Sequence, residues 1–127
     1  RVIQLNPDSA DAYSNRGNIL TNLGRSDEAL RDYDKAIQIK PSFAKAHTNR
    51  GNLLKDLGQL DEALLNYDKA IQLKPDYAEA YSNRGNALLA LGRYEEALPN
   101  YGQATQLKPD FADAYCIAKY AVKNFPK

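Results

Sequence analysis

The sequence is poor in the residues that anchor several common classes of protein. It has one cysteine, Cys116, and no methionine or tryptophan. A single cysteine cannot form an intrachain disulfide, so a disulfide-stabilised fold is excluded and the redox compartment stays open. No segment approaches the roughly 18 apolar residues that span a bilayer, and the N-terminus lacks the apolar core of a secretion signal. We therefore expect a soluble segment with no membrane partner, the cytoplasm being slightly favoured.

Strong net charge is also missing. Seventeen basic and sixteen acidic residues leave a formal net charge of +1 over 127 residues, so no overall field draws the chain to nucleic acid. The basic residues form no stripe that would follow a nucleic-acid backbone, and no nucleic-acid partner is expected. The length suits a single unit. Because the sequence begins with Arg1 and lacks methionine, it can be a fragment or a processed chain.

What the sequence does have is a 34-residue period. Gly17, Gly51 and Gly85 are each followed seven residues later by a second glycine. The same period relates a set of alanines, tyrosines and prolines: Ala29, Ala63 and Ala97; Tyr33, Tyr67 and Tyr101; Pro41, Pro75 and Pro109. We divide the chain into three full units, 10–43, 44–77 and 78–111. Residues 1–9 are interpreted as the end of a preceding repeat, and residues 112–127 as the first helix of a partial fourth repeat.

Each unit reads as an antiparallel pair of helices, so the predicted fold class is all-α. Apolar residues recur at helical spacing on both sides of a Leu-Gly pair such as Leu23-Gly24. A glycine there suits the left-handed residue that ends a helix, and Pro41 stops the second helix. We expect Ser42, Asp76 and Asp110 to cap the helices that follow. One pair cannot cover its own apolar face, so the pairs must stack into a solenoid.

Six residues of the first unit resemble the signature of the tetratricopeptide repeat family. They are Tyr13, Gly17, Ala29, Tyr33, Ala36 and Pro41. The resemblance implies a right-handed superhelix whose first helices line a concave groove. One departure stands out, because the family usually has leucine where this chain has Arg16, Arg50 and Arg84. We predict that these arginines pair with acidic residues of neighbouring helices, such as Asp34 and Asp68.

The same resemblance places one face of each first helix in the groove, and asparagine dominates that face. The predicted groove residues are Asn15, Asn18, Asn22, Lys45, Asn49, Asn52, Asp56, Asn83 and Asn86, with Ser14, Thr48 and Ser82 on the same expected face. Asparagine is disfavoured inside helices because its amide competes for backbone hydrogen bonds. One explanation is that the amides grip the backbone of an extended peptide, each donating to a carbonyl and accepting from an N–H. The other is that they tie adjacent repeats together or were copied when the repeat duplicated.

Two narrower resemblances would name a ligand or a host enzyme. Tetratricopeptide co-chaperones hold the terminal carboxylate of heat-shock chaperones with lysine, asparagine and arginine. In this chain Ser14 and Glu79 stand at the lysine positions and Asn83 stands at the arginine position. The cations that would hold the carboxylate are therefore absent. Only an alignment that uses Lys45 would retain a cation. Asn15, Asn49 and Asn83, together with residues 107–116, also resemble the arm of O-linked N-acetylglucosamine transferases. That likeness would imply a substrate-recruiting arm of a glycosyltransferase.

Catalytic patterns are missing as well. His47 occupies the position of Tyr13 and Tyr81, which indicates packing. Cys116 has no basic or histidine partner at a recognisable spacing, so we expect an inert, partly buried thiol. No metal cluster, phosphate loop or triad spacing occurs. We expect no enzyme, no metal and no cofactor in this segment.

The predicted function is a protein–protein interaction scaffold that binds an extended peptide or partner protein in an asparagine-lined groove. The alternative is self-assembly, because residues 2–5 form only a half-helix and the last helix carries Ile117 and Tyr120 without a polar cap. Contacts of one chain end with the other, repeated without closure, would give a homo-oligomer or filament.

Overall fold

The structure, a computed structural model, describes residues 9–124, and all regular structure in that range is helical. The elements are α1 (Ala10–Asn22), α2 (Ser26–Ile39), α3 (Ala44–Asp56), α4 (Leu60–Leu73), α5 (Ala78–Ala90), α6 (Tyr94–Leu107), the short 3-10 helix η1 (Pro109–Phe111) and α7 (Ala112–Asn124). The half-helix expected at residues 2–5, and all but Ser9 of the expected preceding repeat, lie outside the described residues.

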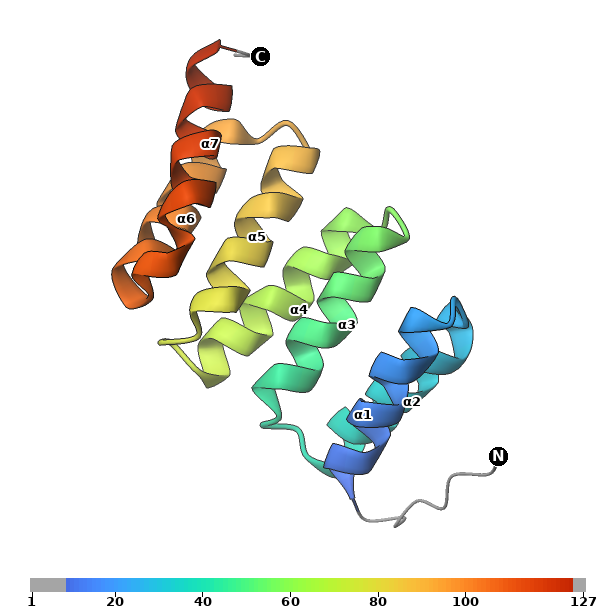
Figure 1. Cartoon of the computed structure of the whole chain (residues 1–127). Coiled ribbons are helices and arrows are strands. Elements are labelled where there is room, and N and C mark those ends of the chain that lie inside the picture. The colour runs from blue at the N-terminus through green and yellow to red at the C-terminus, as the bar shows by residue number, and fades with distance from the viewer. Residues whose placement is uncertain (1–8, 125–127) are drawn as a thin grey trace.

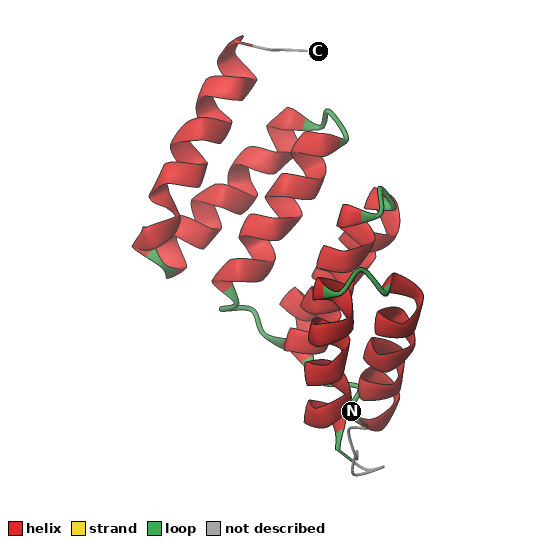
Figure 2. Ribbon diagram, turned by 45° about the vertical axis from the view of Figure 1, so that its right-hand side comes forward, coloured by secondary structure: helices red, strands yellow, loops and turns green. Residues whose placement is uncertain are grey.

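The helices form antiparallel pairs, α1 with α2, α3 with α4 and α5 with α6, and α7 packs against α6. Figure 1 shows the pairs laid side by side along the molecule, with α1, α3 and α5 following one another in one layer. In the turned view of Figure 2, short loops join each helix to the next. The predicted all-α solenoid of helix pairs is confirmed, whereas the right-handed superhelix stays a prediction.

A tyrosine wedged against a glycine holds each pair together. The rings of Tyr33, Tyr67 and Tyr101 are almost completely buried. A Cβ atom added at Gly51 would lie 2.8 Å from Cε1 of Tyr67, and the other two pairs are equally close. Only glycine leaves room for the ring at that point, since atoms at such a distance would overlap. The recurring glycine and tyrosine are thus two halves of one contact.

Glycine also forms the turn inside each pair. Gly24, Gly58 and Gly92 have φ angles of +77°, +81° and +76°, the left-handed region that residues with a Cβ rarely adopt. At the first of these turns, the N–H of Arg25 reaches back to the carbonyl of Leu20, 2.9 Å away. The prediction that these glycines end the first helices is confirmed.

The predicted helix caps are wrong for α3 and α5. Their N-cap residues are Phe43 and Tyr77, one position after Ser42 and Asp76, and neither has a side-chain cap bond. The N–H of Phe43 donates to the carbonyl of Lys40 at 3.0 Å, so a turn closes over the proline and the serine before the helix begins. The third expected cap, Asp110, lies inside η1.

The arginines that replace the family's leucine pair with acidic residues of neighbouring helices, as predicted, and two of them reach the preceding repeat. Nε of Arg50 on α3 donates to Asp34 of α2 at 2.8 Å. Nε of Arg84 lies 2.7 Å from Oδ1 of Asp68, which is an ion-pair distance. The direction of the N–H does not meet the geometry of a hydrogen bond.

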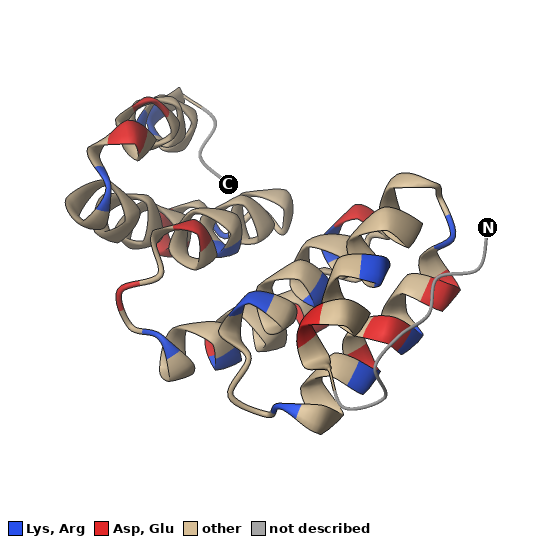
Figure 3. Cartoon of the chain, turned by 60° about the horizontal axis from the view of Figure 1, so that its bottom comes forward, with Lys and Arg blue, Asp and Glu red and all other residues tan. Residues whose placement is uncertain are grey.

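The first arginine pairs inside its own repeat instead. Arg16 makes two bonds of 2.7 Å to the buried Asp32 of α2. In the later repeats this second-helix position is an asparagine, Asn66 or Asn100, which also accepts from the arginine of its repeat. Figure 3 shows the charged residues of both signs interspersed along the helices.

Candidate functional site

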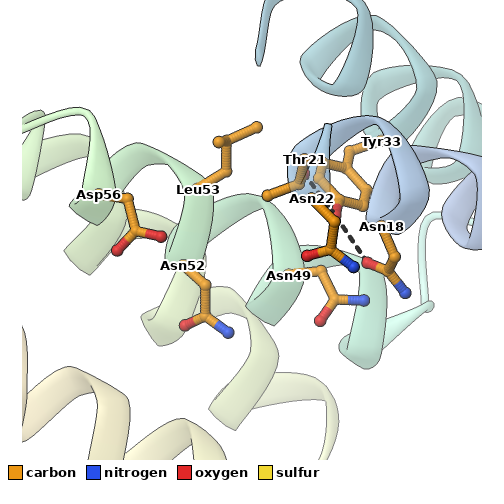
Figure 4. A pocket seen from close by; sticks show the side chains of 8 residues that line it. All are labelled: Asn18, Thr21, Asn22, Tyr33, Asn49, Asn52, Leu53 and Asp56. Carbon is orange, nitrogen blue, oxygen red and sulfur yellow. Dashed lines mark hydrogen bonds between the residues drawn. The ribbon is translucent and has the colours of Figure 1, made fainter. Parts of the chain in front are cut away.

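An open depression of about 300 Å³ lies between α1 and α3. It is lined by Asn18, Thr21, Asn22, Tyr33, Asn49, Asn52, Leu53 and Asp56 (Figure 4). Five of these are predicted groove residues, so the fold brings a large part of the predicted set together. The other four, Asn15, Lys45, Asn83 and Asn86, do not line this depression.

Helical spacing explains how the lining forms. Asn18, Thr21 and Asn22 are three and four positions apart on α1 and therefore share one face of the helix. Asn49, Asn52 and Asp56 follow one another at intervals of three and four positions on α3, so they also share one face. Figure 4 shows the two faces turned toward a common space, with the ring of Tyr33 reaching it from α2. Asp56 is the single charged residue of the lining, so the site is a polar, amide-rich surface.

Each tyrosine of the core bonds to an asparagine of the groove. The hydroxyl of Tyr33 donates to Oδ1 of Asn18 at 2.6 Å, and that of Tyr67 donates to Oδ1 of Asn52 at 2.6 Å. Tyr101 makes the same bond to Asn86.

These phenols are held in the form that can donate. Burial raises the pKa of Tyr33 and Tyr67 above the ordinary phenol range, and it raises the pKa of Tyr101 to about 12. The O–H is therefore kept at neutral pH. The bonds join helices of the same repeat, so these asparagines do not tie one repeat to the next.

Asn49 has a different environment. Its Nδ2 atom is buried, and no acceptor within residues 9–124 bonds to it. By contrast, the buried Nδ2 of Asn66 and that of Asn100 each donate at 2.9 Å to a backbone carbonyl four residues earlier. A buried donor left unsatisfied costs about 1–3 kcal/mol. Asn49 therefore adds to the lining of the depression a buried amide donor that has no acceptor among residues 9–124.

Comparison with known protein families decides the family. A profile described as tetratricopeptide repeat matches residues 10–43 and 78–111. Two further profiles, a TPR repeat and a second tetratricopeptide repeat, match residues 51–92 and 32–64. The chain belongs to the tetratricopeptide repeat family.

A solved structure with the same fold is the first TPR of Spaghetti (RPAP3) bound to the HSP90 peptide SRMEEVD. The two share 27% sequence identity with a TM-score of 0.85, over 97% of this chain and 100% of that one. No curated protein is significantly similar in sequence. Since 252 chains of solved structures match this tetratricopeptide array, the fold alone does not name a partner.

Three residues expected on the groove face of the tetratricopeptide array are instead buried. Ser14, Thr48 and Ser82 are only 2%, 2% and 5% exposed. The hydroxyl of Thr48 donates to the carbonyl of Ala44 at 3.2 Å. Burial raises the pKa of Tyr77, the residue immediately before α5, and the proximity of Thr48 offsets part of this rise. This position thus packs one repeat against the next and cannot contact a ligand.

The predicted burial of Cys116 is also wrong, since its side chain is exposed. Cys116 occupies on α7 the position that Thr48 has on α3, which the following repeat covers. The described residues supply no such cover for α7.

His47 is buried, as its packing interpretation requires. Its Nε2 lies 3.2 Å from the carbonyl oxygen of Pro41. Burial lowers the pKa of His47, the bond to the Pro41 carbonyl offsets part of this effect, and Lys69 and Arg50 lower the pKa further. The imidazole is therefore neutral and donates its Nε2 proton.

Residues 9–124 contain no cluster of three or more histidine, cysteine or acidic residues placed to bind a metal. None of the described helices has the length and apolar character that a membrane span requires.

Sequence reasoning missed the hydroxyl of Tyr33 as part of the groove, because tyrosine was interpreted only as a space-filling ring. A signal was present. Asparagine and tyrosine recur 15 residues apart in every unit, at Asn18 and Tyr33, Asn52 and Tyr67, and Asn86 and Tyr101. A polar pair with a fixed separation in three repeats favours a conserved contact between two helices.

Proposed function

We propose that the chain is a non-catalytic interaction module that binds an extended peptide in the asparagine-lined groove between α1 and α3, continuing onto α5. The observation that carries this proposal is the buried Nδ2 of Asn49, a donor without a partner in a depression lined by three further asparagines. Membership in the tetratricopeptide repeat family and the peptide in the Spaghetti structure support a protein or peptide partner.

The lining favours an uncharged stretch of peptide. Primary amides bond equally well to any main chain, whereas carboxylates need cations. The depression contains no lysine or arginine and one carboxylate, that of Asp56. The peptide held by the Spaghetti domain carries three acidic residues. We expect such an acidic peptide to bind this groove poorly because Asp56 and Glu79 would repel it.

The test begins with a peptide selected on the protein itself. Random linear 12-residue peptides displayed on phage are enriched on the immobilised chain, and the affinity of an enriched peptide is measured by calorimetry. Asn49→Ala with Asn83→Ala removes two groove amides at about 0.5–1.5 kcal/mol each. This corresponds to roughly a tenfold weaker Kd.

The matched control removes two amides from the second helices. Gln38→Ala with Gln72→Ala, at exposed positions of α2 and α4, should leave the affinity unchanged. Equal losses in both double variants, or no loss in either, would contradict the proposal. Circular dichroism establishes that all variants keep their helices.

Self-association is a second candidate function, favoured by the surface of α7. Ile117 and Tyr120 are 68% and 63% exposed. They occupy the positions that asparagines hold in the other first helices. Light scattering after size-exclusion chromatography tests this candidate. Ile117→Asp should dissociate an assembly that the groove variants leave intact. A parent protein that stays monomeric at millimolar concentration rejects self-association. The likeness to glycosyltransferase arms stays a prediction.

A further inference from the structure

The buried tyrosines determine whether the oxygen or the nitrogen of each groove asparagine's side-chain amide faces the ligand. A buried phenol O–H must donate, because leaving it unsatisfied costs about 1–3 kcal/mol. Near Tyr33, the hydroxyl of Thr21 is already committed as a donor to the carbonyl of Gly17 at 2.9 Å. The amide oxygen of Asn18 is the nearer acceptor of the phenol, at 2.6 Å, whereas the hydroxyl oxygen of Thr21 is 3.3 Å away. The oxygen therefore points into the repeat.

The amide nitrogens of these asparagines lie on the side of the amide that faces away from the tyrosine hydroxyl. In Figure 4 the oxygen of Asn18 meets the dashed bond and its nitrogen lies on the far side of the amide. Within residues 9–124, no hydrogen bond uses Nδ2 of Asn18, Asn52 or Asn86. Nδ2 of Asn49, in the same depression, is a fourth donor without an acceptor. Four amide donors of the groove asparagines are thus left without an acceptor among residues 9–124.

Tight packing keeps this orientation fixed. Each ring is pressed against the backbone of Gly17, Gly51 or Gly85, so the hydroxyl cannot withdraw from its asparagine. Rotating the amide by half a turn would place an N–H against the phenol and remove the oxygen that accepts its short hydrogen bond. The ring, the glycine and the asparagine thus act as one unit in every repeat.

We propose that the groove is a row of hydrogen-bond donors that recognises main-chain carbonyl oxygens of an extended peptide, with Tyr33, Tyr67 and Tyr101 as positioning residues. This inference rests on the proposed function and sharpens it. The amides of Asn18, Asn52 and Asn86 donate to the ligand and accept nothing from it. The N–H groups of the peptide are not read at these positions.

The protein side is tested by asparagine-to-aspartate changes, which keep the shape. Asn18→Asp combined with Asn52→Asp preserves an acceptor for each tyrosine and removes both donors. The helical content and melting temperature should remain close to the parent values, while affinity for the selected peptide falls at least about tenfold. Because added charge could repel the ligand, the measurement is repeated at 1 M salt, where screening removes surface electrostatics but not donor loss. Full affinity in this variant overturns the proposal.

The tyrosines are tested by a spectroscopic signature. Tyr33→Phe removes the oxygen that fixes Asn18 while keeping the ring against Gly17. The side-chain amide resonances of Asn18 should lose their ligand-induced shift, and those of Asn49 should keep it. Tyr13→Phe is the control, since Tyr13 lies on α1 and makes no hydrogen bond to a groove asparagine. Unchanged Asn18 shifts in Tyr33→Phe contradict a positioning role.

The ligand side gives an independent test with the selected peptide. Methylating single main-chain nitrogens removes an N–H and keeps a full amide carbonyl, so these peptides should bind within about twofold of the parent. Thioamides weaken the carbonyl acceptor, and at contacting positions they should bind about fivefold to tenfold less well. If loss of the N–H weakens binding and weakening of the carbonyl does not, the proposed row of donors is wrong, while binding of the peptide in the groove is not contradicted. Failure to enrich any peptide, or full affinity in Asn49→Ala with Asn83→Ala, rejects both proposals.

Discussion

At the scale of residues, the glycines differ in what surrounds their missing side chain. Gly51 faces the ring of Tyr67, which an added Cβ would approach to 2.8 Å. Gly102, in the middle of α6, has Tyr115 as its nearest neighbour at 3.8 Å, an ordinary contact distance. The first glycine is required by packing, whereas the second only weakens its helix.

Alanine should therefore have opposite effects at the two positions. We expect Gly51→Ala to lower the free energy of unfolding by about 1–3 kcal/mol through overpacking. Gly102→Ala should raise it by about 1 kcal/mol, because alanine is the better helix former. Urea denaturation measures both. Effects of the same sign would show that the contact between Gly51 and Tyr67 is not tight.

His47 gives the fold a pH dependence near neutrality. Its folded-state pKa lies below the unfolded value of about 6.5. The stability that a neutral buried imidazole contributes is thus fully present above pH 6.5 and is lost as the pH falls through the lower folded pKa. His47→Tyr, which restores the residue of the other repeats, should remove this part of the pH dependence. Chemical denaturation between pH 7 and 5 checks it, and parallel curves for both proteins would contradict the account.

At the scale of elements, α6 differs from the other second helices. Pro99 lies inside it, at its sixth residue. A proline there cannot supply the N–H that would bond to the carbonyl of Glu95, and it costs about 3 kcal/mol in a helix interior. Gly102 adds to this weakness. The helix nevertheless runs unbroken from Tyr94 to Leu107 because Ala97, Tyr101 and Ala104 are buried between α5 and α7.

Amide hydrogen exchange should therefore be faster in α6 than in α4. The two helices have the same length and the same place in their repeats. We expect protection factors at least about tenfold lower in α6. Replacing Pro99 by leucine, the residue at position 65, should restore much of the difference. Equal protection in the parent protein would refute the prediction.

The elements were predictable because each is marked by residues with strong local requirements. Gly24 and Pro41 set the ends of helices, and the period of 34 gave the pairing. The caps at Ser42 and Asp76 were not predictable in the same way. The turn after the proline ends one residue later than capping by Ser42 or Asp76 requires. The aromatic residue between the repeats, Phe43 or Tyr77, therefore takes the N-cap position.

At the scale of the whole molecule, the ion pairs between repeats add little to the stability of the stack. The side chains of Arg84 and Asp68 are 35% and 43% exposed, and such pairs are worth about 0–1 kcal/mol. The buried contacts of the tyrosines and alanines carry most of the cohesion.

A double-mutant cycle on Arg84→Ala and Asp68→Ala should therefore give a coupling energy below about 1 kcal/mol. The cycle on Arg16→Ala and Asp32→Ala should give a larger value, because the side chain of Asp32 is only 6% exposed and accepts two bonds. Urea denaturation supplies the four free energies of each cycle. A larger coupling at Arg84 would reverse our ranking.

The groove was partly predictable at this scale. Periodicity and the family resemblance placed Asn18, Asn49 and Asn52 on one surface, and the structure brings them together. The direction of each amide was beyond sequence reasoning, because it depends on a hydroxyl that arrives from another helix. The burial of Thr48 was also missed, since it depends on where the next repeat begins.

The central claim is that a peptide lies against the asparagines of α1 and α3. Its most direct test is an NMR titration of the isotopically labelled chain with the selected peptide, following the side-chain amide signals. The account predicts saturable shifts at Asn18, Asn49 and Asn52 and none at Gln38 and Gln72. Shifts confined to α2, α4 or α7, with the groove asparagines unmoved, would contradict it.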